Sequence, residues 1–207
     1  MTIDIEEWSV PVPARMRGTI TIDLGPLFDA VHSLDSRGRH SWRPIAPCAL
    51  ATVRFEKPDL SWCGRAYVDM NAGTEPLEAG FRNWTWSRED AGDSTRIIYD
   101  VQERDGTRRG LALDYSPDGS IRHLDPDPPQ ALPRTGWLVS RSTRARAEKP
   151  SRLLRTLEDT PFYSRSVLAF DRDGASCSAV NESVDLDRFA ARWVQMLLPF
   201  KMPRRAG

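Results

Sequence analysis

Three polar residues at alternate positions, Tyr67, Asp69 and Asn71, could together carry chemistry. In an extended strand, residues two positions apart point to the same face, so a phenol, a carboxylate and an amide would stand in one row. Such a row is unusual for a face that meets only solvent. In an apolar pocket a carboxyl group keeps its proton, because desolvation disfavours the anion, and it can then act as an acid.

The residues around this row predict the element that positions it. Apolar residues alternate with the polar ones from Leu60 to Met70, which is typical of a strand with one polar and one apolar face, the apolar one suited to a core. The strand is expected to end at Ala72-Gly73, and Glu75-Pro76 to turn the chain. A dense aromatic group follows, made up of Phe81, Trp84 and Trp86.

The composition limits the class of protein. Lys+Arg and Asp+Glu both number 29, so the net charge is zero, which argues against nucleic-acid binding by bulk positive charge. Seven Trp and 16 Pro favour an all-β body. The three Cys have no disulfide spacing and the three His no metal-ligand spacing, so we expect reduced thiols and no metal site. Without an apolar span or signal peptide, the expected location is cytoplasmic.

The pattern along the chain predicts a β-meander that closes into a barrel. Strand signals alternate with short turns such as Asp105-Gly106. One helical turn is expected at 26–31, and a proline-rich loop at 125–133. Extended chain or strands are expected at 1–8, 18–24, 40–48, 51–55, 60–71, 95–102, 111–115, 121–123, 136–143, 152–157, 164–170 and 175–184.

The C-terminal segment differs from the rest. Asp187 can cap a helix over 188–198, with Phe189, Trp193, Met196 and Leu197 on one face. The pattern is typical of a helix packed on a barrel, which we adopt as the interpretation. The alternative is an anchor at a membrane surface, because basic residues follow the aromatic ones.

Four separated motifs follow one another along the chain. They are Trp42-x-Pro44-Ile45-Ala46-Pro47-Cys48, Tyr67-x-Asp69-x-Asn71-x-Gly73-x-Glu75-Pro76 with Phe81 and Trp84-x-Trp86, Leu157–Tyr163, and Trp193-Val194-Gln195 with Leu198-Pro199-Phe200. Together they resemble the carotenoid 1,2-hydratases (hydroxyneurosporene synthases), over the C-terminal portion of that family. The resemblance implies the second half of a two-barrel architecture, a lipocalin-like β-barrel with a C-terminal helix. Residues 1–24 would then be strands of a preceding barrel half and residues 25–207 the hydratase domain, and a missing N-terminal portion or self-association would cover exposed sheet edges.

The family implies addition of water to the terminal C1=C2 double bond of acyclic carotenoids such as neurosporene or lycopene, without a cofactor. Asp69 matches the acid of the family motif, and Trp42 and Tyr67 are candidates for stabilising the tertiary carbocation that protonation creates. Asn71 could orient Asp69 or the water, and Arg65 is expected to point past the pocket. The further candidates for the substrate pocket are Trp62, Trp84 and Trp86.

The sequence is compatible with two other functions. The barrel could be a binding module that holds an apolar ligand, or a truncated inactive remnant, if the missing N-terminal portion removes the chemistry. It could also catalyse cyclisation of a terpenoid or polyketide on the same scaffold. Because a long polyene resides in the membrane, we expect peripheral contact with the inner membrane.

Overall fold

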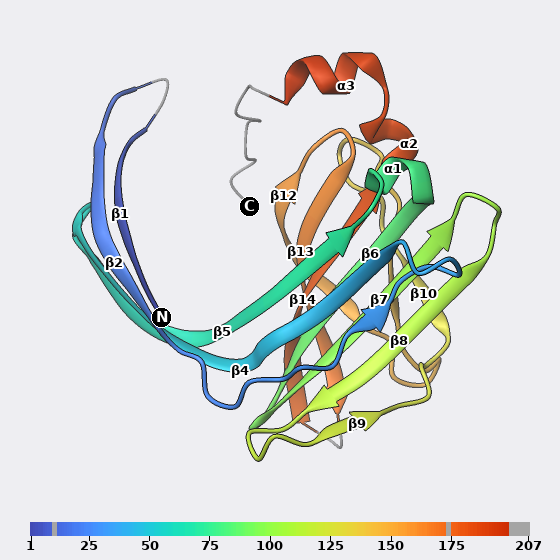
Figure 1. The fold of residues 1–207 in the computed structure, drawn as a ribbon, viewed down its shortest axis with the longest axis horizontal. Coiled ribbons are helices and arrows are strands. Elements are labelled where there is room, and N and C mark those ends of the chain that lie inside the picture. The colour runs from blue at the N-terminus through green and yellow to red at the C-terminus, as the bar shows by residue number, and fades with distance from the viewer. Residues whose placement is uncertain (10–11, 173–174, 199–207) are drawn as a thin grey trace.

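The computed structural model describes residues 1–9, 12–172 and 175–198, which form a body built mainly of strands (Figure 1). The strands form a five-stranded, a seven-stranded and a two-stranded sheet. The five-stranded sheet contains β1 Thr2–Trp8, β2 Arg15–Asp23, β3 His32–Ser33, β4 His40–Lys57 and β5 Leu60–Gly73. The seven-stranded sheet contains β6 Phe81–Ala91, β7 Ser94–Glu103, β8 Arg108–Tyr115, β9 Ile121–His123, β12 Arg152–Asp159, β13 Tyr163–Arg172 and β14 Ala175–Asp185. The small sheet pairs β10 Pro129–Leu132 with β11 Arg141–Arg144, and the helices are α1 Leu77–Gly80, α2 Leu186–Phe189 and α3 Arg192–Leu197.

β4 and β5 form the longest strand pair and carry the polar row. They run antiparallel, from His40 opposite Gly73 to Phe55 opposite Leu60. The register shifts where β4 contains Pro44 and Pro47, because proline cannot donate to the ladder. One end of the pair lies against the seven-stranded sheet, and the other end curves away together with β1 and β2 (Figure 1).

The main core lies between these two sheets. Trp42 of β4 is fully buried, and its ring centroid lies 5.3 Å from that of Tyr99 on β7. Phe28 packs edge-on against Tyr115, at 5.0 Å. Burying one large apolar side chain stabilises a fold by about 1.5–3 kcal/mol. The other buried members of this cluster are Leu34, Phe81, Ile97, Val101, Leu113, Val184 and Leu186.

The orientation of the two faces of β5 is the reverse of the prediction. Tyr67, on the polar face, packs against the core, whereas Leu60, Trp62 and Met70 on the apolar face are each 48% exposed. The expectation that the apolar face forms the core is therefore wrong. Alternation fixes which residues share a face, but the packing of the two sheets decides which face turns inward.

Two predicted connections are also wrong in part. Residues 26–31 form no helical turn; the chain runs irregularly beside β4, with the Phe28 N–H donating to the Ile45 carbonyl at 2.9 Å. The expected loop at 125–133 contains β10, which tolerates its proline because it pairs only with β11. Of the strand expected at 136–143 only the end is extended, as β11, and Leu138 has a positive φ of 64°.

The single C-terminal helix predicted over 188–198 is instead two short helices. Asp185, rather than Asp187, caps α2 by accepting a hydrogen bond from the Arg188 N–H at 3.0 Å. Ala191 is extended, with ψ 130°, and separates α2 from α3. Val194 is the buried residue of α3, whereas Trp193 and Met196 are 49% and 74% exposed. The predicted packed face is therefore wrong for α3.

The all-β prediction and most predicted strands are confirmed. The extended segments at 40–48 and 51–55 join into β4, and the hairpin at Asp105-Gly106 connects β7 and β8. Within the described ranges, no strand pairing joins the five-stranded to the seven-stranded sheet. The two sheets face each other, but the ladder does not close around them.

Candidate functional site

Asp69, Tyr67 and Trp42 meet in one hydrogen-bonded group. The Trp42 Nε1–H donates to Asp69 Oδ2 at 2.8 Å, and the Tyr67 hydroxyl donates to the same oxygen at 3.1 Å. Trp42 Nε1 also lies 3.2 Å from the Tyr67 oxygen. β4 and β5 create this arrangement, because Pro44 pairs with Asp69 and Trp42 pairs with Asn71 across the ladder. Two donors on one oxygen fix the carboxyl group and leave Oδ1 facing away from them.

Aromatic rings surround this group. The Tyr67 ring lies 5.2 Å from Trp86 of β6, and Tyr99 lies 5.3 Å from Trp42 and 5.8 Å from Trp84. Burial raises the pKa of Tyr67 well above its usual range, and the Asp69 charge raises it further. The Tyr67 phenol is therefore neutral at physiological pH and keeps the proton that it donates to Asp69.

Arg65 points past Asp69 and is engaged elsewhere, as expected. Its guanidinium donates to the Ser94 carbonyl at 3.3 Å and lies 3.8 Å from the Asp90 carboxylate. An ion pair with Asp69 would have favoured the anion and weakened it as an acid. The alternation in the sequence places Arg65 on the same face of β5 as Asp69, but it lies four residues earlier along the strand and therefore away from the Trp42 contact.

The other predicted site residues divide into two groups. Trp84 and Trp86 are half-buried and pack against the core beside Tyr67 and Tyr99. Asn71 is exposed, and the hydrogen bonds recorded at Asp69 come from Trp42 and Tyr67 instead. Trp62 lies on the opposite face of β5 and is not brought to the group.

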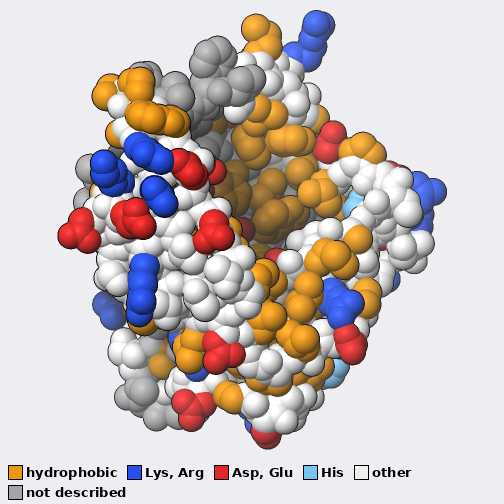
Figure 2. All heavy atoms as spheres, turned by 60° about the vertical axis from the view of Figure 1, so that its left-hand side comes forward, with side chains coloured by type: hydrophobic (Ala, Val, Ile, Leu, Met, Phe, Trp, Pro, Cys, Tyr) orange, Lys and Arg blue, Asp and Glu red, His pale blue; other side chains and the backbone are white. Residues whose placement is uncertain are grey.

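Figure 2 shows a hollow lined by hydrophobic side chains on the face that comes forward when the molecule is turned toward β1 and β2. Charged side chains lie around the hollow on the surrounding surface. An apolar hollow of this kind suits an apolar ligand, because binding removes hydrophobic surface of both molecules from water.

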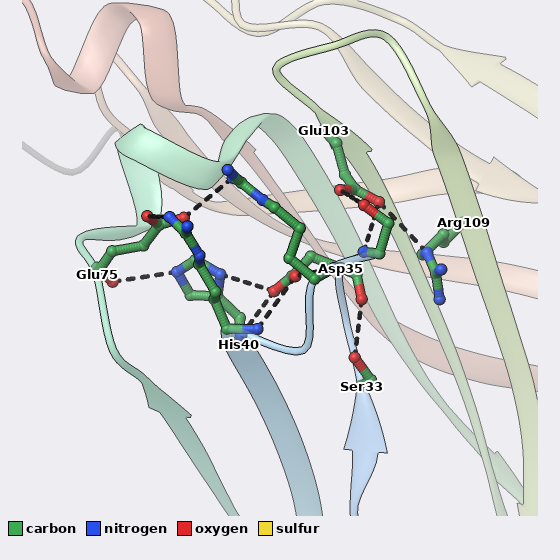
Figure 3. Close-up of polar contacts among 9 residues, drawn as sticks. Ser33, Asp35, His40, Glu75, Glu103 and Arg109 are labelled. Carbon is green, nitrogen blue, oxygen red and sulfur yellow. Dashed lines mark hydrogen bonds and ion pairs between the residues drawn. The ribbon is translucent and has the colours of Figure 1, made fainter.

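A second polar network lies at the start of β4 (Figure 3). His40 is 2% exposed and lies at the centre of this network. Its Nδ1 lies 3.0 Å from Asp35 Oδ2 and its Nε2 lies 3.1 Å from the Glu75 carbonyl oxygen. Asp35 also accepts from the backbone N–H groups of Arg37, Arg39 and His40.

This network joins three connecting segments of the fold, namely the loop before β4, the turn after β5 and the hairpin between β7 and β8. Glu103 of β7 accepts hydrogen bonds from the Ser36 N–H at 3.0 Å and from its hydroxyl at 2.8 Å, and Arg109 of β8 lies 3.3 Å from Glu103 (Figure 3). A Cβ on Gly80 would lie 2.7 Å from the His40 ring, which explains glycine at that close approach. The network anchors the start of β4, two residues before Trp42, and so supports the site from outside.

Sequence reasoning missed Tyr99, Tyr163 and Glu182, which face the same interior. Alternation within β7 does place Tyr99 with the buried Ile97 and Val101, so its orientation was readable. Its contact with Trp42 depends on how the two sheets face each other, which no local pattern records. Within the described ranges, no group of three or more His, Cys, Asp or Glu side chains is arranged to hold a metal ion.

The fold defines an all-β, lipocalin-like protein. Its interior holds the polar group of Asp69, Tyr67 and Trp42, which is surrounded by the rings of Trp84, Trp86 and Tyr99, called the aromatic wall below. The fold is similar to that of an AttH-assigned protein from Nitrosomonas europaea, with a TM-score of 0.52 at 14% identity over 87% of this chain and 68% of that one. It is also similar to CghA solved with Sch210972, with a TM-score of 0.50 at 11% identity over 82% and 61% of the two chains.

The chain belongs to the carotenoid hydratase CrtC family, whose model matches residues 1–207. It is 43% identical to the acyclic carotenoid 1,2-hydratase of Thiocapsa roseopersicina and 41% identical to that of Rubrivivax gelatinosus, over its whole length and 51% of each relative. It is 34% identical to the Rhodobacter capsulatus enzyme of the same name, over 74% of that protein. The chain thus spans about half the length of the first two relatives.

Proposed function

We propose that this chain carries the proton-donating site of a carotenoid 1,2-hydratase, which adds water to the terminal C1=C2 bond of acyclic carotenoids. The observation that carries the proposal is the fixing of Asp69 by Trp42 and Tyr67 within an aromatic interior. Family membership supports the reaction type, and the names of the relatives support acyclic carotenoids as substrates.

The reaction begins with proton transfer from Asp69. An isolated alkene is a very weak base, so the acid must be protonated and close to the double bond. Trp42 and Tyr67 both bind Oδ2, which leaves Oδ1 as the oxygen that presents the proton. The alkene π electrons take this proton at C2, and the positive charge appears at the tertiary carbon C1.

The aromatic wall stabilises this cation. The faces of Trp86, Tyr99 and Trp84 attract a cation through their π electrons, with about 0.5–2 kcal/mol per well-placed ring. The charge develops only in the transition state, so these contacts favour it over the neutral substrate. Water then forms the C1–O bond, and loss of its proton completes the tertiary alcohol.

The C-terminal helices favour contact with a membrane, which would deliver the polyene. Trp193, Met196 and Leu198 are 49%, 74% and 44% exposed. Trp137 and Leu138, also exposed, lie next to α2, where Arg188 Nη1 donates to the Trp137 carbonyl at 2.6 Å. No helix in the described residues is long and apolar enough to cross a membrane.

The exposed side chains of α3 give a test of this contact. Because they would enter the membrane surface, a double Trp193→Ser, Met196→Ser variant should co-sediment about tenfold less with anionic vesicles. Equal binding of the variant would remove this contact from the proposal.

Hydratase activity is tested in cells that accumulate lycopene or neurosporene. The parent chain is expressed beside Asp69→Asn and beside Asp29→Asn, whose carboxylate is 92% exposed and serves as the matched control. Pigments are analysed by mass for addition of one water. We expect product from the parent chain and the control, and a loss of about 1000-fold or more in Asp69→Asn.

The other outcomes each change the interpretation. Product from Asp69→Asn at the parent level would remove Asp69 from the mechanism. A folded parent chain that retains carotenoid without hydrating it would refute the proposal and favour an apolar-ligand-binding module. Turnover of a different polyene without water addition would favour a cyclase.

A further inference from the structure

A row of side chains crosses the inner face of the seven-stranded sheet, opposite Asp69. Neighbours in this row are directly paired across the ladder, so their side chains share one face. Trp86 and Tyr99 belong to the row and pack against the core, which identifies the face as the inner one. In order across β12, β13, β14, β6 and β7, the row is Glu158, Arg165, Glu182, Trp86 and Tyr99.

Glu182 is the carboxylate of this row that adjoins the aromatic wall. Its side chain is 17% exposed, and its Oε1 accepts from Arg165 Nε at 2.8 Å. Burial raises the pKa of Tyr163, and the charge of Glu182 raises it further. Glu158 lies two strands further from Trp86, and its Oε2 is 4.0 Å from Arg165 Nη1.

Asp69 and Glu182 lie on two sides of the same aromatic pair. Trp86 neighbours Glu182 in the ladder and contacts the Tyr67 ring at 5.2 Å, and Tyr67 in turn binds Asp69. Tyr99 connects the same two groups, because its ring lies 5.3 Å from that of Trp42, which donates to Asp69, and because it pairs with Trp86 across the ladder. Burial raises the pKa of Tyr99, and the charges of Asp69 and Glu182 raise it further. A bound alkene end over Trp86 and Tyr99 would therefore have one carboxyl group on each side.

The surroundings of the two carboxyl groups suit different tasks. Among the described residues, the donors to Asp69 are an indole N–H and a phenol, and both are neutral. Glu182 is paired with a guanidinium, which balances its negative charge. An ion-paired carboxylate is a weak base, but a protonated alcohol is a very strong acid and gives its proton to any carboxylate within reach. Two carboxyl groups in contrasting environments are the usual basis for dividing acid and base roles.

We infer that Glu182 is a second catalytic residue, which holds the attacking water and accepts its proton. This inference rests on the proposed hydratase function. Asp69 gives its proton to C2, the oxygen lone pair of the water held by Glu182 forms the C1–O bond, and the released proton passes to the Glu182 carboxylate. Asp69 is left as the anion and Glu182 as the acid, and exchange with solvent restores both. The net change is addition of one water.

The test measures how the carbocation is partitioned. The purified chain is given detergent-dispersed lycopene in D2O, and products are analysed by mass and NMR. Without a held water, the cation returns to an alkene by losing H⁺ to the Asp69 carboxylate. The recovered alkene then carries deuterium at C2, or at C2 of the isomer with a terminal methylene. The readout is the ratio of deuterated alkene to alcohol.

We expect Glu182→Gln to raise this ratio at least tenfold and to slow alcohol formation by about 100-fold. Arg165→Gln is the matched control, because it breaks the same ion pair but keeps the carboxylate. If Glu182 served only to hold Arg165, both variants would show the same ratio, and the inference would be overturned. Thermal melting of each variant shows whether a loss of folding contributes.

The inference and the proposed function fail in different ways. If the parent chain makes neither alcohol nor deuterated alkene, both the proposed function and the inference are refuted. If the parent chain makes alcohol and Glu182→Gln shows the same ratio and rate, only the role of Glu182 is refuted. Asp69→Asn should give neither product, since it removes the step that precedes the partition.

Discussion

Two carboxyl groups at one end of the β4–β5 pair have contrasting surroundings. Asp35 is 3% exposed and accepts hydrogen bonds from three backbone N–H groups and from His40. Asp69 is half-buried and accepts from Trp42 and Tyr67, both at one oxygen. Three backbone donors and His40 favour the Asp35 anion and lower its pKa to about 2, although burial opposes this shift.

The contrast teaches how to separate a structural carboxylate from a reactive one. Asp35 uses its acceptor capacity to hold a loop, so protonating it would break several contacts at once. Asp69 keeps one oxygen outside the Trp42 and Tyr67 contacts, and aromatic rings rather than backbone N–H groups surround it. A search for the reactive carboxyl group by burial alone would have chosen Asp35, because it is more buried than Asp69.

The largest expected effect is on stability. Asp35→Ala removes the partner of His40 and leaves three backbone N–H groups unpaired, so we expect a loss of about 3–5 kcal/mol in the free energy of unfolding. Asp69→Ala should cost less than half of this. Urea denaturation of both variants measures the difference. Equal losses would mean that the two carboxyl groups do not differ in structural role.

A smaller effect is expected on acid stability. The folded pKa of Asp35, about 2, lies below its ordinary value of 3.8, so the folded state binds the proton more weakly than the unfolded state. The stabilisation is therefore present above pH 3.8 and is lost as the pH falls from 3.8 toward 2. It amounts to about 2 kcal/mol.

Unfolding free energies between pH 5 and 2 measure this loss for the parent chain and for Asp35→Asn. The variant should show a shallower fall over the same range. A parallel fall in both proteins would assign the acid sensitivity to other carboxyl groups.

An effect of similar size is expected for the hydrogen bond that Trp42 donates to Asp69. Trp42→Phe removes the N–H at 2.8 Å from Oδ2 but keeps an aromatic ring. Loss of one hydrogen bond to a charged group corresponds to about 1.5–3 kcal/mol, so hydratase kcat/KM should fall by about 10- to 100-fold. Trp84→Phe is the control, because Trp84 contacts Tyr99 through its ring, whereas the indole that donates to Asp69 is that of Trp42. Equal losses would show that ring size, rather than the indole N–H, matters at position 42.

Much of the fold was predictable because strands leave local signals. The turn at Asp105-Gly106 was predictable, and it connects β7 and β8 as expected. The C-terminal helix was misplaced because Asp185 and Asp187 are equally good caps in sequence, and only the Asp185 side chain reaches the Arg188 N–H. β10 was missed because proline weakens a strand signal, while an edge strand tolerates it.

The sequence by itself determined that Tyr67 and Asp69 share one face of a strand, since the period of two is a property of the extended backbone. It also determined that Trp84 and Trp86 share a face of the strand after the turn. Only the tertiary structure decided that the polar face of β5 turns inward, that Trp42 donates to Asp69, and that Glu182 lies beyond Trp86. These relations join residues from different strands, and the packing of one sheet against the other sets them.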